Sequence, residues 1–363
     1  MRGLRQILEI RAAVLRKRGG PLKIESLQME GPREDEVLVR LVGSGICRTD
    51  IDFVDEWDES DVPVVLGHEG AGVAELVGKK VKKVRAGDHV VLSYQSCGRC
   101  GPCRSGRPTD CTRFWEANFG FARLDGSNAL ERSRVRGHFF GQSSFATHAL
   151  ATERNLVKVP ADLDLEMLAP LGCGMQTGAG TVMNSLKVPA GSSIAIFGTG
   201  SVGLAAVMAA RIVGADPIIA VDVKRKRLEL ALELGATHTL LNRRANIPAR
   251  IADIAGNSVD YALEITGSPE MYQAAVEALK PHGIVATFAG GSANDSLPEG
   301  KREISIIQGD AVPQRFIPRL IELYLNGQFP FDRLVKFYDF AAINRAMTDS
   351  RKGRTIKPVL RME

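Results

Sequence analysis

The sequence lacks the features that mark membrane, secreted and nucleic-acid-binding proteins. No apolar run approaches the roughly 18–20 residues that cross a bilayer. The first ten residues, MRGLRQILEI, contain three charged side chains and no apolar core, which argues against a secretory signal. The net charge of +5 is a mild excess, and the densest basic run, Lys224 to Arg227, is interpreted as the solvated face of a helix. We therefore predict no membrane and no nucleic acid among the partners.

Cysteine is also scarce, but its placement is informative. Of the 6 cysteines, 4 lie in one short loop that is rich in glycine: Cys97, Cys100, Cys103 and Cys111. Overlapping Cys-x-x-Cys pairs cannot satisfy their geometry with independent disulfides, whereas tetrahedral zinc takes four thiolates. The loop therefore predicts a closed, structural zinc site. Metal-binding cysteines without an export signal favour a cytoplasmic protein.

The 363 residues suffice for two domains, each with its own core. The N-terminal part is typical of a barrel-like, mainly β domain, because short apolar runs alternate with turns. We predict strands there at 36–42, 72–77, 89–94 and 144–151. The polar and basic stretch 121–137 is predicted to be a loop.

The pattern changes to alternating strands and helices from Ser192 onward, which predicts a doubly wound α/β domain with a parallel sheet of six strands. The clearest segments are a strand at 193–197, a helix at 202–213, a strand at 218–222, a helix at 225–234 and a strand at 284–289. An amphipathic helix is expected at 318–326, and the tail is expected to return to the first domain. We place the catalytic domain at 1–175 and 306–363 and the cofactor domain at 176–305.

A glycine-rich motif opens the second domain. Gly198, Gly200 and Gly203 form G-x-G-x-x-G, with Ser201 and Val202 completing the turn after an apolar strand. Such a turn lets the backbone approach a pyrophosphate at a helix N-terminus.

Asp222 ends the next strand, 19 residues beyond Gly203, where a carboxylate binds the adenosine ribose. This predicts NAD in preference to NADP. Arg227 and its basic neighbours weaken that preference slightly, because they could neutralise a phosphate.

The remaining cysteines, with one histidine, suggest a second metal site. Cys47, His68 and Cys173 are far apart in sequence, but each lies within two residues of a glycine, and two thiolates with one imidazole leave a fourth zinc position open. That is the arrangement of catalytic zinc. Taken singly, Cys47 or Cys173 is more often a small buried residue than a ligand.

Together these motifs resemble the zinc-dependent medium-chain alcohol dehydrogenases over essentially the full length. The resemblance implies a GroES-like catalytic domain, a Rossmann domain, two zinc ions per subunit and NAD. It makes Cys47, His68 and Cys173 the catalytic zinc ligands, and the four-cysteine loop the structural zinc lobe. Homodimers or homotetramers are typical of the family.

The same resemblance implies roles for neighbouring residues. Glu69 matches the acid beside the metal, Asp50 the acid that orients the ligating histidine, and Thr49 the hydroxyl that bonds the substrate oxygen. Two basic residues, Arg48 and Lys357, match contacts to the cofactor phosphates.

Within the family, segments such as FFGQSSFATHAL and GRTIKPVL are most similar to bacterial aryl-alcohol (benzyl alcohol) dehydrogenases. Phe139 and Phe140 fall where the family lines its substrate pocket, and Trp57 and Tyr94 are further candidate walls. Aromatic walls favour a ring substrate. The alternative for each ring is ordinary core packing.

The reaction that the resemblance implies is reversible oxidation of a primary alcohol to the aldehyde, with hydride transfer to NAD. Liver-type members end their proton relay in a histidine five residues after the first cysteine ligand, where this chain has Asp52. Asp52 is either the terminal base or a solvated loop residue.

Two other functions fit the same motifs. One is a dehydrogenase of the same fold that acts on polyols, sugars or aliphatic alcohols. The other is a non-catalytic zinc- and NAD-binding module with a redox-sensing role. The open metal position argues against the second, since a pure binding protein has no need of it.

Overall fold

The computed structural model describes residues 6–242, 246–288 and 297–362. It divides into two compact units, the first formed by residues 1–173, 312–318 and 332–363 and the second by 174–311 and 319–331. Residues 1–5 of the N-terminal stretch, and residue 289 at the end of one predicted strand, lie outside the described residues.

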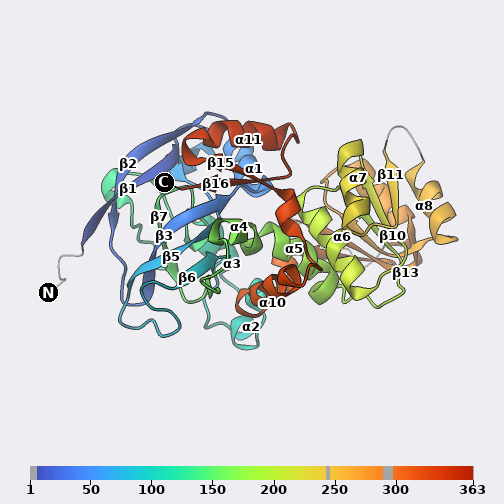
Figure 1. Cartoon of the computed structure of the whole chain (residues 1–363), viewed down its shortest axis with the longest axis horizontal. Helices are drawn as coiled ribbons and strands as arrows, with labels where there is room; N and C mark the ends of the chain where they lie inside the picture. The colour runs from blue at the N-terminus through green and yellow to red at the C-terminus, as the bar shows by residue number, and fades with distance from the viewer. Residues whose placement is uncertain (1–5, 243–245, 289–296, 363) are drawn as a thin grey trace. The chain divides into compact units, whose positions relative to one another are not determined.

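The first unit is built on two β-sheets (Figure 1). The larger has the order β15-β16-β3-β5-β6-β8, with β7 also paired to β3, and the smaller has the order β2-β1-β4. The strands of the larger sheet are β3 (Glu36–Gly45), β5 (Glu69–Val77), β6 (His89–Leu92), β7 (His148–Thr152), β8 (Leu156–Lys158), β15 (Val335–Asp339) and β16 (Lys357–Arg361). Those of the smaller are β1 (Ile7–Leu15), β2 (Leu22–Glu30) and β4 (Val64–Val65).

Alternation of apolar and polar residues explains the core of this unit. One face of β3 buries Val37, Val39 and Leu41 against side chains of β5, β6 and β7. The C-terminal strand β16 pairs antiparallel with the end of β3. Residues from the N-terminal and C-terminal parts of the sequence therefore lie on neighbouring strands inside the same sheet.

Short helices connect these strands. They are α1 (Arg48–Glu56), α2 (Gly101–Arg104), α3 (Phe114–Phe119), α4 (Leu165–Leu168) and α11 (Ile343–Arg351). Helix α10 (Pro313–Leu325) begins earlier than the predicted residue 318, because Pro313 starts the helix and Pro318 lies inside it. Proline is favoured in the first turn of a helix, which is the position of Pro313.

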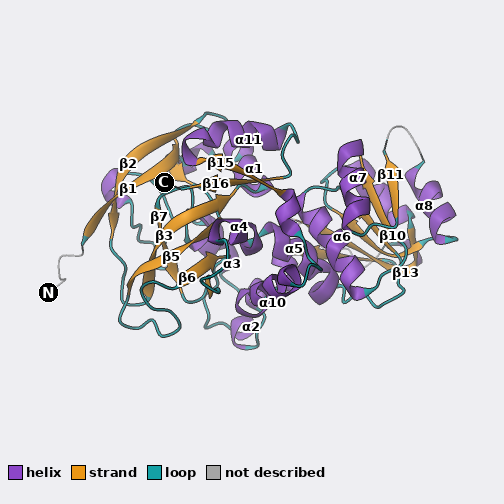
Figure 2. Cartoon of the chain, viewed as in Figure 1, coloured by secondary structure: helices purple, strands orange, loops and turns teal. Residues whose placement is uncertain are grey.

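The second unit is the predicted doubly wound domain, with helices beside a parallel sheet (Figure 2). The sheet has the order β11-β10-β9-β12-β13-β14, and all of its pairs are parallel. Its strands are β9 (Ile194–Phe197), β10 (Ile218–Asp222), β11 (His238–Leu241), β12 (Val259–Glu264), β13 (Leu279–Phe288) and β14 (Arg302–Ile306). Its helices include α5 (Gly174–Gly180), α6 (Ser201–Val213), α7 (Arg225–Leu234), α8 (Ile247–Ala255) and α9 (Pro269–Glu277). The prediction of six parallel strands is confirmed.

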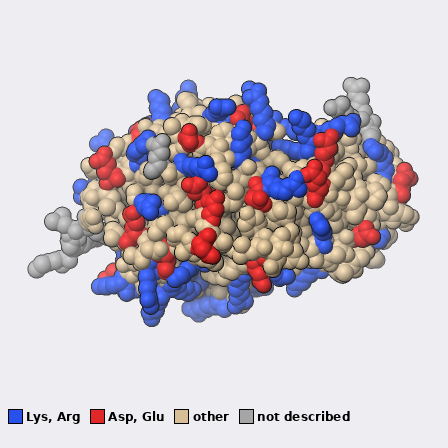
Figure 3. Space-filling model, in the orientation of Figure 1, with Lys and Arg blue, Asp and Glu red and all other residues tan. Residues whose placement is uncertain are grey.

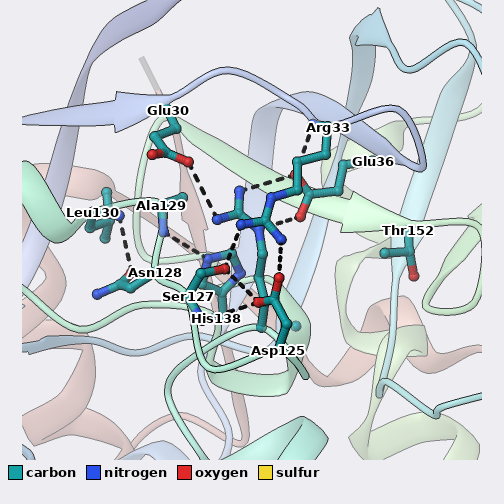
Figure 4. A network of polar contacts seen from close by, with 12 residues as sticks. Glu30, Arg33, Glu36, Asp125, Ser127, Asn128, Ala129, Leu130, His138 and Thr152 are labelled. Atoms are coloured by element: carbon teal, nitrogen blue, oxygen red, sulfur yellow. Dashed lines mark hydrogen bonds and ion pairs between the residues drawn. The ribbon is translucent and has the colours of Figure 1, made fainter. Parts of the chain in front are cut away.

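A buried polar network anchors the predicted loop 121–137 to the first unit (Figure 4). The guanidinium of Arg123 donates to both carboxylate oxygens of Glu36, at 2.5 and 3.0 Å, and both side chains are almost fully buried. Arg33 pairs with Asp125 at 2.6 Å, close beside. Farther along, Ala129 O accepts from Glu30 N of β2 and Arg136 O accepts from Val65 N of β4, so the stretch is bonded to the unit along its length.

Among the described residues, no helix has the length and apolarity that a membrane crossing requires. Basic and acidic side chains both occur across the face drawn in Figure 3. In the basic run 224–227, Arg225 and Lys226 are exposed on α7, as expected for a solvated helix face.

Candidate active site

Four side chains of the first unit converge on one buried point. The sulfurs of Cys47 and Cys173, a ring nitrogen of His68 and a carboxylate oxygen of Glu69 all lie within 4.8 Å of one another. All four residues are buried. Two thiolates, an imidazole and a carboxylate are a donor set typical of zinc.

Separate elements bring these residues together. Cys47 is the N-cap of α1, directly after β3, while Cys173 ends the turn that follows α4. His68 and Glu69 stand at the start of β5. The preceding residue, Gly67, has φ +91°, and a Cβ there would lie 2.4 Å from the backbone nitrogen of Phe145. Only glycine fits this turn, which aims His68 inward.

Asp50 fixes the orientation of the histidine. Its Oδ1 lies 2.9 Å from His68 Nδ1 and accepts from Gly67 N at 3.1 Å, while Oδ2 accepts from Cys47 N at 2.9 Å. Asp50 is fully buried. One carboxylate thus positions both a histidine and a cysteine of the donor set, as partners of metal ligands do.

The other ring nitrogen has no such partner. Within the described residues, His68 Nε2 is buried and no group hydrogen-bonds to it. A buried nitrogen without a partner is costly, unless it faces a ligand. Because this nitrogen has no hydrogen-bond partner and lies next to two sulfurs, the donor set fits a metal ion.

The electrostatics agree with a cation at this point. Hydrogen bonding with Cys173, together with His68 nearby, lowers the pKa of Cys47 well below its usual range despite burial. Burial lowers the pKa of His68, but Asp50 outweighs it and the pKa is raised to about 10. A proton and a metal ion both bring positive charge to the ring. Surroundings that stabilise a proton on His68 therefore also favour a metal cation bound to the neutral ring.

Lys357, a predicted phosphate contact, is bonded to Glu69 and to the backbone in this structure. Its ammonium donates to both carboxylate oxygens of Glu69, each at 2.9 Å, and to the carbonyl oxygen of Ile46 at 3.2 Å. Lys357 has no exposed surface. The ammonium is thus enclosed and held by three oxygens of the protein, and the contact of Lys357 with a cofactor phosphate stays a prediction.

The first turns of α1 carry three further candidates. The hydroxyl of Thr49 lies 3.8 Å from Cys47 Sγ, beside the donor set. Arg48 is largely exposed and pairs with Asp52 across one helical turn, with 2.6 Å between Nε and Oδ1. Burial raises the pKa of Asp52 although Arg48 opposes this. Asp52 therefore lies in a helix and not in a loop, with a cationic partner and 42% of its side chain exposed.

The four-cysteine loop forms a second convergence. The sulfurs of Cys97, Cys100, Cys103 and Cys111 lie within 4.8 Å of one another, and none is in a disulfide. The sulfur of Cys111 accepts backbone N–H groups from Cys97 and Arg113, at 3.3 and 3.4 Å. Such bonds stabilise thiolates. Four thiolates leave no position for a substrate, so this site fits a structural metal.

The glycine-rich turn of the second unit has the predicted form. It links β9 to α6, with Gly198 at φ +100° and Gly200 as the N-cap. A Cβ on Gly203 would lie 1.9 Å from the carbonyl oxygen of Gly198, so only glycine lets the helix start this close to the strand. Ser201 and Val202 form the first turn of α6. Free N–H groups at this N-terminus suit a pyrophosphate.

Asp222 lies at the end of β10 and is bonded back to that turn. Its Oδ2 accepts from both the backbone nitrogen and the hydroxyl of Thr199, at 2.8 and 2.7 Å, and Oδ1 accepts from Lys224 N at 2.8 Å. The guanidinium of Arg227 is 4.0 Å from Oδ2. Thr199, whose side chain couples the carboxylate to the turn, was not predicted from the sequence.

Aromatic rings continue from the histidine of the donor set. Phe140 stacks on His68 with 4.4 Å between ring centroids, and Phe139 meets the same ring edge-on at 5.5 Å. Phe119 of α3 lies 5.0 Å from Phe140 and 6.2 Å from the exposed ring of Trp57. The two predicted phenylalanines therefore adjoin the donor set, and Trp57 stands farther out in the same cluster.

Two other rings bear on this cluster. Tyr94 is buried and pairs with Phe114 at 5.6 Å; Phe114 and Trp115 lie between it and Phe119, so the position of Tyr94 fits the alternative of core packing. Phe119 was missed, although it contacts both Phe139 and Phe140. Its only sequence signal is a second aromatic segment, FWEANF, soon after the cysteine loop.

Comparisons with known proteins agree on one family. Residues 33–161 match the family described as an alcohol dehydrogenase GroES-like domain, and residues 201–322 match the family of zinc-binding dehydrogenases. Geraniol dehydrogenase from Castellaniella defragrans is 44% identical, over 99% of this chain and 100% of its own length.

Solved structures give the same result. Benzyl alcohol dehydrogenase from Acinetobacter calcoaceticus is 45% identical, with a TM-score of 0.94 over 98% of this chain and 100% of the other. An alcohol dehydrogenase zinc-binding domain protein from Burkholderia ambifaria is 48% identical, with a TM-score of 0.94 over 99% of this chain and 100% of the other.

Proposed function

This chain belongs to the zinc-dependent medium-chain alcohol dehydrogenases, with zinc and NAD as cofactors, and we propose that it oxidises primary aryl alcohols of the benzyl type to their aldehydes. One observation carries the substrate class: the stacking of Phe140 on His68 at 4.4 Å, with further rings beyond it. A substrate oxygen held beside His68 brings its carbon skeleton against these rings.

The rings suit a flat, apolar substrate. The centroid distances that join Phe140, Phe139 and Phe119, between 4.9 and 5.9 Å, are those of edge-to-face pairs. Phe140 has φ +52°, which is uncommon for a bulky residue. A sugar or polyol would leave its hydroxyl groups without partners against such a wall.

We assign the predicted roles on the same basis. Cys47, His68 and Cys173 hold the catalytic metal, which as a Lewis acid favours loss of the alcohol proton, and NAD accepts the hydride. Thr49 holds the alcohol proton in a hydrogen bond beside Cys47, and Asp50 keeps His68 in one orientation. Asp52 is the proposed candidate for the terminal base of the proton relay.

The cofactor and assembly proposals rest on separate features. Asp222 and the glycine turn bind NAD, and the carboxylate disfavours a 2′-phosphate. Arg48 remains the proposed phosphate contact on α1, since its side chain is exposed. The four-cysteine loop holds the structural zinc. A homodimer or homotetramer, and a cytoplasmic location, stay predictions.

The test is a substrate panel with a matched pair of variants. Benzyl alcohol, geraniol, ethanol and sorbitol are compared by kcat/KM, through NADH absorbance. Phe140→Leu should lower the benzyl alcohol to ethanol ratio by about 2- to 12-fold, the value of one aromatic pair of about 0.5–1.5 kcal/mol. Phe331→Leu, in a buried aromatic cluster of the second unit, should leave the ratio unchanged. An unchanged ratio in Phe140→Leu would remove the aromatic wall from substrate selection.

A second candidate substrate comes from the relatives. One relative of 44% identity is named geraniol dehydrogenase, and its namesake substrate is an unsaturated, non-aromatic primary alcohol. The same rings accept such a chain by burial alone. Equal kcat/KM for geraniol and benzyl alcohol, with both well above ethanol, would assign the pocket to apolar unsaturated alcohols in general.

A further inference from the structure

Trp57 is a partly exposed aromatic residue at the C-terminal end of α1. The residue is 38% exposed, but its ring stacks on that of Phe53, with 3.8 Å between centroids and 22° between planes. Phe53 is buried and meets Phe139 edge-on at 4.7 Å. Trp57 is therefore the outer end of an aromatic cluster whose inner end, Phe139, adjoins His68.

One carboxylate holds this ring at its edge. The indole nitrogen Nε1 of Trp57 donates to Asp61 Oδ2 at 2.8 Å, and Asp61 Oδ1 accepts from the guanidinium of Arg136 at 2.7 Å. The ion pair is partly exposed, with 48% of the Arg136 side chain and 22% of the Asp61 side chain accessible, so it adds little to stability. Its effect is to fix the direction of the carboxylate, and the carboxylate in turn fixes the indole.

The backbone holds Arg136 in place. Its N–H donates to the carbonyl oxygen of Pro63 at 2.8 Å, and its carbonyl oxygen accepts from Val65 N at 3.0 Å, so Arg136 lies in register beside β4. Asp61 ends a short 3₁₀-helix just before the same strand. The stretch 121–137 therefore reaches the aromatic cluster through Arg136, at a point that backbone pairing fixes.

A tryptophan ring that is stacked on one face and hydrogen-bonded at its edge has little freedom to turn. Without the acceptor, the indole can turn about its two side-chain torsions, and its flat face no longer lies at one place in the cluster. Phe119, which contacts Phe140 at 5.0 Å, lies 6.2 Å from Trp57 with 24° between the planes. Phe119 and Trp57 are thus two nearly parallel rings that follow Phe140 in the cluster.

We propose that Asp61, held by Arg136, is a positioning residue that keeps the Trp57 ring in place as the outer wall of the substrate pocket. An alcohol whose aryl ring lies farther from its hydroxyl group reaches past Phe140 to Phe119 and Trp57, and stacking on a fixed ring favours it. Benzyl alcohol is shorter and contacts Phe140 instead. The clamp therefore extends the preference for flat aryl groups to longer alcohols. This inference rests on the proposed function, because it needs the alcohol oxygen at the donor set.

The first test measures the ring itself and needs no turnover. In full-length protein with Trp115→Phe, Trp57 is the only tryptophan, since the sequence contains 2. Asp61→Ala should raise the acrylamide quenching constant of its fluorescence about twofold, because a ring in a residue that is 38% exposed turns toward full exposure. Asp58→Ala is the matched control in the same segment. It removes a bond to Ser60 N but leaves the clamp, so its quenching should equal that of the parent.

The second test measures substrate selection. It compares kcat/KM for cinnamyl alcohol, whose ring lies farther from the hydroxyl group, with kcat/KM for benzyl alcohol. Asp61→Ala should lower this ratio about 2- to 12-fold, the value of one aromatic pair, while the benzyl alcohol to ethanol ratio stays at the wild-type value. In a Trp57→Phe background there is no indole N–H to hold, so Asp61→Ala should change the ratio by less than about twofold. A carboxylate that only stabilised the segment would act alike in both backgrounds.

A second variant guards against loss of folding. Arg136→Met removes the outer bond and leaves the Asp61 carboxylate without the group that fixes its direction. It should move the quenching and the cinnamyl alcohol ratio in the same direction as Asp61→Ala. If Asp61→Ala does not accumulate as folded protein, Arg136→Met decides.

Three results would overturn the proposal: equal quenching of Trp57 in Asp61→Ala and its parent, an unchanged cinnamyl alcohol ratio, or an Asp61→Ala effect that is equally large in the Trp57→Phe background. Failure of the proposed function is a different outcome. In that case Phe140→Leu leaves the benzyl alcohol to ethanol ratio unchanged, whereas the quenching of Trp57 does not depend on any substrate.

Discussion

Replacing Asp50 by asparagine is the sharpest test of how this chain positions its metal ligands. The carboxylate accepts three hydrogen bonds, two at Oδ1 from His68 and Gly67 and one at Oδ2 from Cys47 N. An amide has a single acceptor oxygen. In its better orientation the oxygen keeps His68 and Gly67, and its NH₂ group then faces the backbone N–H of Cys47.

The magnitude follows from this mismatch. A buried N–H that loses its acceptor costs about 1–3 kcal/mol of stability. Loss of a carboxylate that supports a ligating histidine typically lowers metal affinity about 10- to 100-fold. We therefore expect Asp50→Asn to release its catalytic zinc to a coloured chelator at a concentration at which the wild type retains both metals.

Asp52→Asn is the matched control, two residues along the same helix. Its pair with Arg48 is exposed and spans one helical turn, so its contribution is about 0.3–0.5 kcal/mol. Zinc release from this variant should equal that of the wild type. Equal release from Asp50→Asn and the wild type would refute the positioning role of Asp50. The pH–rate profile of Asp52→Asn separately tests the proton relay, and an unchanged profile removes Asp52 from it.

Three further predictions concern the lobe, the cofactor and pH. Cys103→Ser should lower the zinc content from two per chain to one, measured by metal analysis, and lower the melting temperature while the visible spectrum of Co²⁺ substituted at the catalytic site persists. Asp222→Asn should raise KM for NAD about tenfold, because a ribose acceptor is lost, and a KM that stays at the wild-type value would contradict the role of Asp222. Burial, aided by Arg123 and Arg33, lowers the pKa of His138 from 6.5 to about 3, so its stability contribution is present above pH 6.5 and is lost as pH falls toward 3. Between about pH 7.5 and about pH 5.5 the wild type should lose about 1.4 kcal/mol of unfolding free energy through this residue. In urea titrations, His138→Gln should lose about that much less over the same pH range. Equal losses in the two proteins would contradict a lowered pKa for His138.

Local sequence signals predicted the second unit well. The strand at Ile218–Asp222 and the helix at Arg225–Leu234 lie as expected, because apolar periodicity and glycine turns are local properties. The β1–β2 hairpin escaped prediction. Its strands carry charged residues among the apolar ones, and their pairing is decided by contacts with the rest of the unit.

The candidate site shows where local signals end. Sequence motifs indicated Cys47, His68 and Cys173 as a donor set, and the structure brings these residues together. Sequence motifs could not indicate Phe119. Its ring can line a substrate pocket only if its short helix packs beside Phe140, and that packing is a tertiary contact. Tyr94 shows the reverse case, since a ring near the site in sequence packs into the core.

The sequence by itself determined the chemistry that this protein carries: four thiolates in one loop, a second set of two cysteines and a histidine, and a glycine turn with an acid at the next strand end. Each of these depends on residue type and short spacing. Tertiary structure alone decided the place of Lys357. Strands from opposite ends of the chain flank β3, and this topology brings a buried ammonium 2.9 Å from the carboxylate beside the metal site. No local pattern encodes a contact across 288 residues, because only strand pairing creates it.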